Sequence, residues 1–428
     1  MLINMASRRV LLALALLAVL APCALALTLW PQPSSVASGT ASLQVASDFK
    51  FGVEGTAECD TLRNAFDRYS ALIFAHAATT TRSESVCVLS ALVFSIDSQD
   101  ESHPQLETDE SYSLSIPSCE SGPAPAVATA HAQTVYGALR ALETFSQLIA
   151  FDFDAGIYSI GETPISVQDA PRFPHRGLMI DTSRHYQPLP ALRALIDSLP
   201  YAKLNVLHWH VSDTQSFPLE VRSHPRLWAA AFTPAERYTQ ADVAAVVEYA
   251  RARGVRVMVE FDMPGHAQSW CVGYPEVCPS STCTTPLNVA RNATFDFVAS
   301  LLAEMTGGQR SQPNAPSGLF PDTFLHLGGD EVNTTCWGQS PEIAAWMAAH
   351  NLTEDGAYAY FVGRASDIAI AQGRRPVQWS EVFDHFKGKL NKQTIVHVWK
   401  DVTNVTEVVA LGYDVLRNVG YDNISYEN

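Results

Sequence analysis

The feature that most constrains the fold is an alternation of short apolar segments with amphipathic segments from Phe173 onward. Segments between the apolar runs carry apolar residues at helical spacing, as in Leu192, Leu195 and Leu199. Strands alternating with helices predict βα units and a parallel sheet. The predicted strands are residues 177–181, 204–211, 255–261, 323–327, 376–379, 394–399 and 414–418.

Two α/β architectures contain such a sheet, the doubly wound sheet and the (β/α)8 TIM-type barrel. No Gly-x-Gly-x-x-Gly follows a strand, so nothing supports dinucleotide binding. We expect no bound cofactor. Polar and aromatic residues instead cluster around the strand ends, as at the active-site face of a barrel. We therefore expect a barrel at residues 171–428, truncated before its eighth unit. The clustered residues are Arg176, Asp181, Asp213, Asp262, His266, Asp330, Glu331, Trp379, Trp399 and Tyr421.

Adjacent carboxylates at a glycine bend make 324–337 the strongest candidate for catalysis. An apolar strand ends in Gly328-Gly329, and Asp330 and Glu331 follow directly. Where a strand stops and the backbone turns, both side chains can face one pocket. A buried carboxyl beside an ionised one has a raised pKa and can act as an acid. The pair therefore indicates acid/base catalysis.

The chain before the barrel divides into a targeting segment and a small domain. Residues 1–26 have a basic start, an apolar run and a small-residue cleavage site, as in a signal peptide, with an uncleaved signal anchor as the alternative. Residues 27–170 read as an α+β domain, with helices near 59–76 and 134–149 and strands near 87–96 and 111–116. This domain shows no catalytic motif, and we expect a structural or docking role.

Cysteines and glycosylation motifs agree with a secretory route. Five Asn-x-Ser/Thr sequons are present. The chain has 8 cysteines, and without Cys23 of the leader an odd number is left. Cys271 and Cys278 could close a short loop. No Cys/His spacing indicates a zinc site, so we expect no metal.

The net charge of −16 argues against nucleic acid and anionic membranes as partners. A neutral or weakly polar substrate is compatible with this charge. A metal-dependent amidohydrolase is an alternative, because His208 and His210 end a strand and His266 and Asp330 follow later strands. Trp209 and the aromatic residues typical of sugar sites weigh against it.

Ordered motifs along the chain resemble the β-N-acetylhexosaminidases of glycoside hydrolase family 20, especially the eukaryotic lysosomal and secreted type. They are Leu29-Trp30-Pro31-Gln32-Pro33, residues 134–148 and 172–186, His208-Trp209-His210, residues 260–266 and residues 326–332. The resemblance implies exo-acting, retaining hydrolysis of terminal β-linked GlcNAc or GalNAc from glycans, glycoproteins or chitooligosaccharides. In this family the substrate's acetamido oxygen is the nucleophile.

The resemblance also assigns roles to individual residues. Glu331 is the expected acid/base, and Asp330 the expected partner of the acetamido N–H. The expected substrate-binding or supporting residues are Arg176, Asp213, His266, Trp379, Trp399, Tyr421 and Asn423. The family's later Trp-Gly-Glu motif is absent, so a sugar-binding or inactive truncated form is the alternative. A lysosomal, vacuolar or secreted location and a homodimer are compatible with the resemblance.

The cysteines follow the family pattern in part. Cys283 and Cys336 match a family disulfide between active-site loops. Cys59 matches a family half-cystine, and its partner would have to be Cys87 or Cys119.

Overall fold

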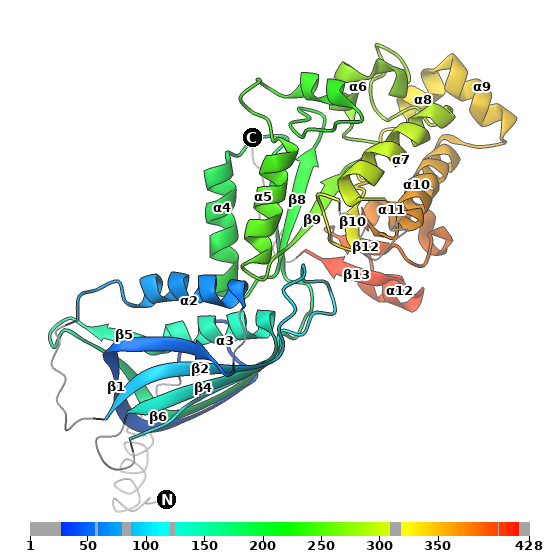
Figure 1. Ribbon diagram of the computed structural model, residues 1–428. Helices are drawn as coiled ribbons and strands as arrows, with labels where there is room; N and C mark the ends of the chain where they lie inside the picture. Colours follow the sequence, from blue (N-terminus) through cyan, green and yellow to red (C-terminus); the bar gives the residue numbers. More distant parts are fainter. Residues whose placement is uncertain are drawn as a thin grey trace, which may run out of the picture.

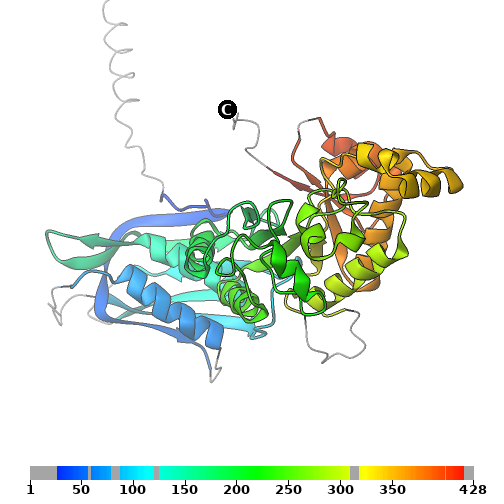
Figure 2. The same ribbon diagram turned by 90° about the horizontal axis from the view of Figure 1, so that it is seen from above.

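The computed structural model describes residues 27–55, 59–78, 87–119, 125–308, 318–400 and 402–418. The predicted signal peptide and the predicted site residues Tyr421 and Asn423 lie outside these ranges. Two sheets lie side by side, one formed by residues 35–169 and one by residues 177–417 (Figures 1 and 2).

The first sheet has six strands in the order β1-β2-β4-β3-β6-β5. Helices α2 (Asp60–Ile73) and α3 (Val135–Leu148) lie on one face of it (Figure 1). The expected α+β unit is therefore present, with more strands than the sequence indicated. The strands are β1 (Ser35–Val53), β2 (Val88–Ser98), β3 (Tyr112–Ile116), β4 (Ala126–Thr134), β5 (Ile149–Asp152) and β6 (Ile157–Asp169).

The second sheet has seven parallel strands in the order β13-β12-β11-β10-β9-β8-β7. Each strand pairs with the next one in the chain, which is the connectivity of a TIM-type barrel. The expected fold is confirmed, and the described residues contain no eighth strand. The strands are β7 (Gly177–Asp181), β8 (Val206–Ser212), β9 (Arg256–Phe261), β10 (Phe324–His326), β11 (Arg375–Trp379), β12 (Ile395–Val398) and β13 (Asp414–Arg417).

Helices cover the outside of this sheet and bury the main apolar core against it (Figure 1). Thr239 begins α5 with a capping box, because its hydroxyl accepts from the Asp242 N–H and the Asp242 carboxylate accepts from the Thr239 N–H. None of the helices in the described residues is long and apolar enough to span a membrane. The helices are α4 (Leu189–Ser198), α5 (Gln240–Arg251), α6 (Gln268–Gly273), α7 (Asn292–Thr306), α8 (Thr335–Gln339), α9 (Pro341–Ala349), α10 (Glu354–Ala371), α11 (Ser380–Phe386) and α12 (Val405–Ala410).

A buried charge cluster joins the two domains at the amino end of β7. One oxygen of Glu110 accepts from Arg140 Nε and from Arg176 Nη2, each at 2.7 Å. Its other oxygen accepts from Asn205 Nδ2 at 2.6 Å. Arg140 also donates to the Gly254 carbonyl across the interface at 2.7 Å. Three donors thus satisfy a carboxylate that is only 6% exposed, and one of them, Arg140, also binds the backbone of the second domain.

This cluster corrects the assignment of Arg176 to the sugar site. Arg176 precedes β7, so it lies at the amino end of the sheet, whereas residues that follow strands lie at the carboxyl end. Its remaining N–H groups donate to the carbonyls of Lys203 and Phe173. Arg176 therefore holds the domains together and does not lie with the acid pair.

The glycine bend after β10 exists because another carboxylate occupies the space beside it. Gly328 and Gly329 both have positive φ, 64° and 97°. A Cβ on Gly328 would lie 1.7 Å from Asp262 Oδ1. The Gly329 N–H donates to that same oxygen at 2.9 Å. The bend therefore needs glycine for both conformation and space.

Three disulfides are present among the described residues. Cys271–Cys278 and Cys283–Cys336 confirm two predicted pairs. The second joins the loop before α7 to α8, close to the acid pair in sequence. The expected partnering of Cys59 is wrong, because Cys87 pairs with Cys119 and the Cys59 thiol is buried and free. Burial raises the pKa of this thiol to about 11.

We expect Arg176→Met to destabilise the protein by about 3 kcal/mol, because it leaves part of the buried Glu110 charge uncompensated. Calorimetric unfolding of the purified protein measures this loss. Arg63→Met is the matched control, since Arg63 and Asp60 form an exposed pair (58% and 72%). Exposed pairs contribute about 0–1 kcal/mol. Equal unfolding temperatures for Arg176→Met and Arg63→Met would contradict the docking role of Arg176.

We expect Gly328→Ala to lower the free energy of unfolding by about 2–5 kcal/mol, because of backbone strain and the clash with Asp262. Gly363→Ala is the control, because Gly363 lies within α10 with open space around its Cβ position. That change should stabilise by about 0.5–1 kcal/mol. Chemical denaturation checks both, and a Gly328→Ala variant as stable as wild type would refute this account of the bend.

Candidate active site

The acid pair and the histidine of the preceding loop meet at the carboxyl end of the second sheet. His266 Nε2 lies 3.6 Å from Asp330 Oδ2 and 3.5 Å from Glu331 Oε2. The side chain of Asp330 is 15% exposed and that of Glu331 is 58% exposed. His266 and Glu331 have positive φ values of 47° and 48°, which are uncommon for residues other than glycine. The backbone is thus bent so that one imidazole serves both carboxyls.

Asp213 lies behind His266 and is fully buried. Its Oδ1 lies 3.3 Å from His266 Nδ1, and its Oδ2 lies 2.8 Å from both Arg184 Nη2 and His210 Nε2. Burial opposes ionisation, yet the hydrogen bonds from His210 and His266 hold the pKa of Asp213 well below its ordinary value. For His266, burial favours the neutral form, but Asp213 and Asp330 raise its pKa. Asp213 therefore orients the imidazole and favours its protonated form.

Arg184 is a site residue that the sequence analysis missed. It follows β7, and its Nη1 donates to Asp181 Oδ2 at 2.9 Å while Nη2 pairs with Asp213. Its side chain is 35% exposed, so part of it remains open to solvent. The sequence does contain a signal for this residue, because an arginine three residues after a predicted strand is expected at the carboxyl end of the sheet. Arg184 occupies the position at the site that the sequence analysis had given to Arg176.

Two carboxyls face each other below the glycine bend. Burial and the neighbouring Asp330 raise the pKa of Asp262 well above its ordinary value. Burial also raises the pKa of Asp330, to about 6, against the opposite effect of His266. Asp262 is fully buried and Asp330 opens to the site, so a proton shared by the pair resides on Asp262. Asp330 is therefore the carboxyl of the pair that ionises more readily, and it faces the site as an oriented acceptor.

The two tryptophans predicted as pocket walls are each held by a carboxylate. Trp379 ends β11, is 7% exposed and donates from Nε1 to Glu260 Oε1 at 2.8 Å. Trp399 follows β12 and donates from Nε1 to Glu381 Oε2 at 2.8 Å. Lys400 forms an ion pair with the other oxygen of Glu381. Both indoles therefore have fixed orientations at the carboxyl end of the sheet.

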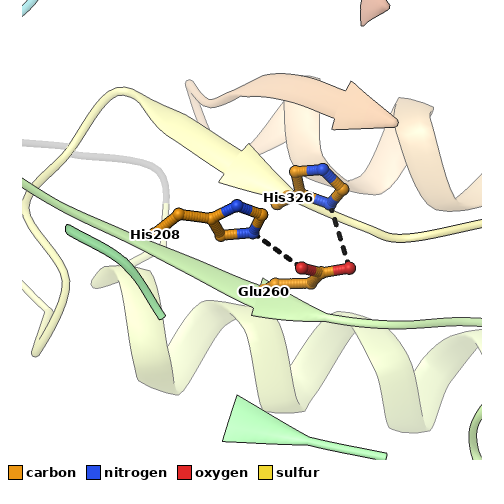
Figure 3. Close-up of side chains that lie close together, drawn as sticks. All are labelled: His208, Glu260 and His326. Carbon is orange, nitrogen blue, oxygen red and sulfur yellow. Dashed lines mark hydrogen bonds and ion pairs between the residues drawn. The ribbon is translucent and has the colours of Figure 1, made fainter. Parts of the chain in front are cut away.

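Beneath Trp379, histidines fill the interior of the sheet around Glu260. His208 and His326 approach its two oxygens at 2.6 and 3.3 Å (Figure 3). His326 Nδ1 accepts from the Gly328 N–H at 3.1 Å, so it carries no proton there. Its pKa is well below the ordinary value because it is buried. Trp379 stacks over His397 with ring centroids 4.3 Å apart.

Among the described residues, three groups of side chains bring nitrogen or oxygen atoms that could bind a metal within 4.8 Å of one another. The groups are His208/Glu260/His326, Asp213/Asp262/His266 and His266/Asp330/Glu331. The donor atoms in the first are already used, since His208 donates to Glu260 and His326 Nδ1 accepts from Gly328. The set proposed for an amidohydrolase is split, because His208 and His210 bind Glu260 whereas His266 faces the acid pair. These residues fit a hydrogen-bonded network better than a metal centre.

Two family descriptions match the chain. "Glycosyl hydrolase family 20, catalytic domain" matches residues 173–421, and "beta-acetyl hexosaminidase like" matches residues 29–148. The first range contains all seven strands of the second sheet, and the second range contains β1 to β4 and both helices of the first domain.

Relatives match over most of the chain. Beta-hexosaminidase 3 of Arabidopsis thaliana is 43% identical over 90% of this chain and 71% of its own length. The mouse beta-hexosaminidase subunit beta is 36% identical over 97% of this chain and 78% of its own length. The solved chitobiase of Flavobacterium johnsoniae is 25% identical, with a TM-score of 0.76 over 92% of this chain. This chain covers 59% of that bacterial protein.

A matched catalytic domain, relatives at these identities and the geometry of the acid pair agree. The chain belongs to glycosyl hydrolase family 20, as a glycoside hydrolase of the eukaryotic β-hexosaminidase type.

Proposed function

We propose that this chain is an exo-acting β-N-acetylhexosaminidase that removes terminal β-linked N-acetylhexosamine with retention of configuration. The observation that carries the proposal is the shared contact of Asp330 and Glu331 with His266 at 3.6 and 3.5 Å. The acid pair lies where a parallel sheet of this type places its catalytic residues. The arrangement offers an acid and an acceptor, and it does not require a protein nucleophile.

In the proposed mechanism the acetamido oxygen of the substrate attacks the anomeric carbon. Glu331 gives its proton to the leaving oxygen, and the bond between the sugar and the leaving group breaks. The exposure of this carboxyl (58%) allows contact with both the leaving group and water. Glu331 then takes a proton from the water that opens the oxazolinium ring.

Asp330 accepts a hydrogen bond from the acetamido N–H and stabilises the positive charge that develops on the ring. Its protonated neighbour Asp262 leaves the negative charge on Asp330, where it faces the substrate. This interaction contributes to the rate only as far as it strengthens in the transition state. His266, oriented by Asp213, supports both carboxyls.

Trp379 and Trp399 are proposed to pack against the sugar ring, and Arg184 to donate to its hydroxyls in place of Arg176. Tyr421 and Asn423 stay predictions from the resemblance. Substrates are proposed to be glycans, glycoproteins or chitooligosaccharides that end in N-acetylhexosamine, and a homodimer stays part of this proposal. The proposed location is the lysosome or vacuole, or the outside of the cell.

We expect Glu331→Gln and Asp330→Asn each to lower kcat by roughly 10²-fold or more on a chromogenic β-GlcNAc glycoside at about pH 5. Each change keeps the shape of the side chain and removes its charge or proton. Glu54→Gln is the control, since Glu54 is exposed in the first domain, away from the site.

A folded wild-type protein that binds GlcNAc without turnover would leave only sugar binding for this chain. Full activity in Glu331→Gln would overturn the assignment of the acid.

A further inference from the structure

We propose that Glu260 is a positioning residue of this active site, because its buried carboxylate holds Trp379 directly and holds His266 through His210 and Asp213. The inference rests on the proposed function, and it assigns a role to a residue that touches no substrate.

Glu260 lies on β9 and is fully buried at the centre of the sheet interior. Three N–H groups converge on its two oxygens. His208 Nε2 lies at 2.6 Å and His210 Nδ1 at 3.0 Å from Oε2, and Trp379 Nε1 lies at 2.8 Å from Oε1. Figure 3 shows His208 and His326 approaching the carboxylate from neighbouring strands. Lysine and arginine make no contact with Glu260 among the described residues, so its charge is balanced by histidine.

The protonation of His210 follows from its two shortest contacts. Its Nδ1 faces Glu260 Oε2 at 3.0 Å, and its Nε2 faces Asp213 Oδ2 at 2.8 Å, closer than Arg184 Nη1 at 3.4 Å. Two ionised carboxylates can only accept, so both ring nitrogens must carry a proton. His210 is therefore an imidazolium held between two carboxylates. Burial alone would lower its pKa, but Glu260 and Asp213 raise it to about 10.

The contacts form one path of alternating charge from the interior to the acid pair. Glu260 is negative, His210 positive and Asp213 negative, and Asp213 orients His266 at 3.3 Å. His266 then contacts Asp330 and Glu331. Removing the charge of Glu260 would remove one of the two carboxylates that keep His210 protonated, so His210 would lose its proton at a lower pH and Asp213 would then lose a charged donor.

The titratable groups that face this path come from every strand from β7 to β12. Asp181 and Arg184 face it from β7 and the residues that follow, His208, His210 and Asp213 from β8 and its end, and Asp262 and His266 from the end of β9. His326, Asp330 and Glu331 face it from β10 and its end, Glu381 from the end of β11 and His397 from β12.

The test compares wild type, Glu260→Gln and Val206→Ala. Val206 is a fully buried apolar residue in the interior of the same sheet, so its truncation weakens the core without touching the path. We expect Glu260→Gln to lower kcat by at least about tenfold with a smaller change in KM, and to move the pH profile. Val206→Ala should lower the melting temperature and leave the pH profile unchanged.

A second readout does not depend on turnover. With ¹³C-labelled histidine, the wild-type His210 resonance, assigned through His210→Gln, should stay that of an imidazolium up to about pH 9. In Glu260→Gln it should titrate at least about two pH units lower. If Glu260→Gln fails to fold, His210→Gln should itself lower kcat by about tenfold or more.

An unchanged His210 titration in folded Glu260→Gln would overturn the inference, as would a pH profile equal to that of Val206→Ala. Absence of wild-type turnover would instead count against the proposed function, and the titration would still decide the role of Glu260.

Discussion

The structure of the site depends on burying charge at the carboxyl end of a parallel sheet with every charge paired. Glu260, His210, Asp213 and Arg184 alternate in sign, and three strand ends supply them. Removing one partner of a buried ion pair typically costs 3–5 kcal/mol, because the other charge is left uncompensated. The residues therefore hold one another in place. Only a parallel sheet brings these strand ends to one edge.

The two ends of the sheet use charge for different purposes. At the amino end, Arg176 and Arg140 clamp Glu110 and fix the first domain against the second sheet. At the carboxyl end, Arg184 and His266 leave the acid pair partly open to solvent. The same residue type, arginine, thus has a docking role before β7 and a site role after it. Whether the arginine lies before or after the strand decides which of these two roles it has.

Much of the second domain could be predicted from sequence, because its strands are apolar runs and its helices are amphipathic. The glycine bend could also be predicted, although the cause of it, the Asp262 carboxylate, could not. Long strands of the first sheet escaped prediction, since β4 alternates alanine with polar residues and β1 is rich in serine and alanine. The β-branched and aromatic residues of both strands are interspersed with alanine and small polar residues, so neither forms the apolar run or the clear alternation that marks a strand. The sequence did not predict a role for Glu260 and offered His210 only as a possible metal ligand, because their roles arise from pairing across strands.

The most direct test of the central claim is the dependence of the rate on the acetamido group. Hydrolysis would be measured for a chromogenic β-GlcNAc glycoside and for its analogue with a trifluoroacetyl group in place of the acetyl group. Fluorine withdraws electrons from the carbonyl oxygen, so substrate assistance predicts a fall in kcat of roughly 10²-fold or more with the first product still the β anomer. Equal rates for the two glycosides, or a first product of α configuration, would contradict the account.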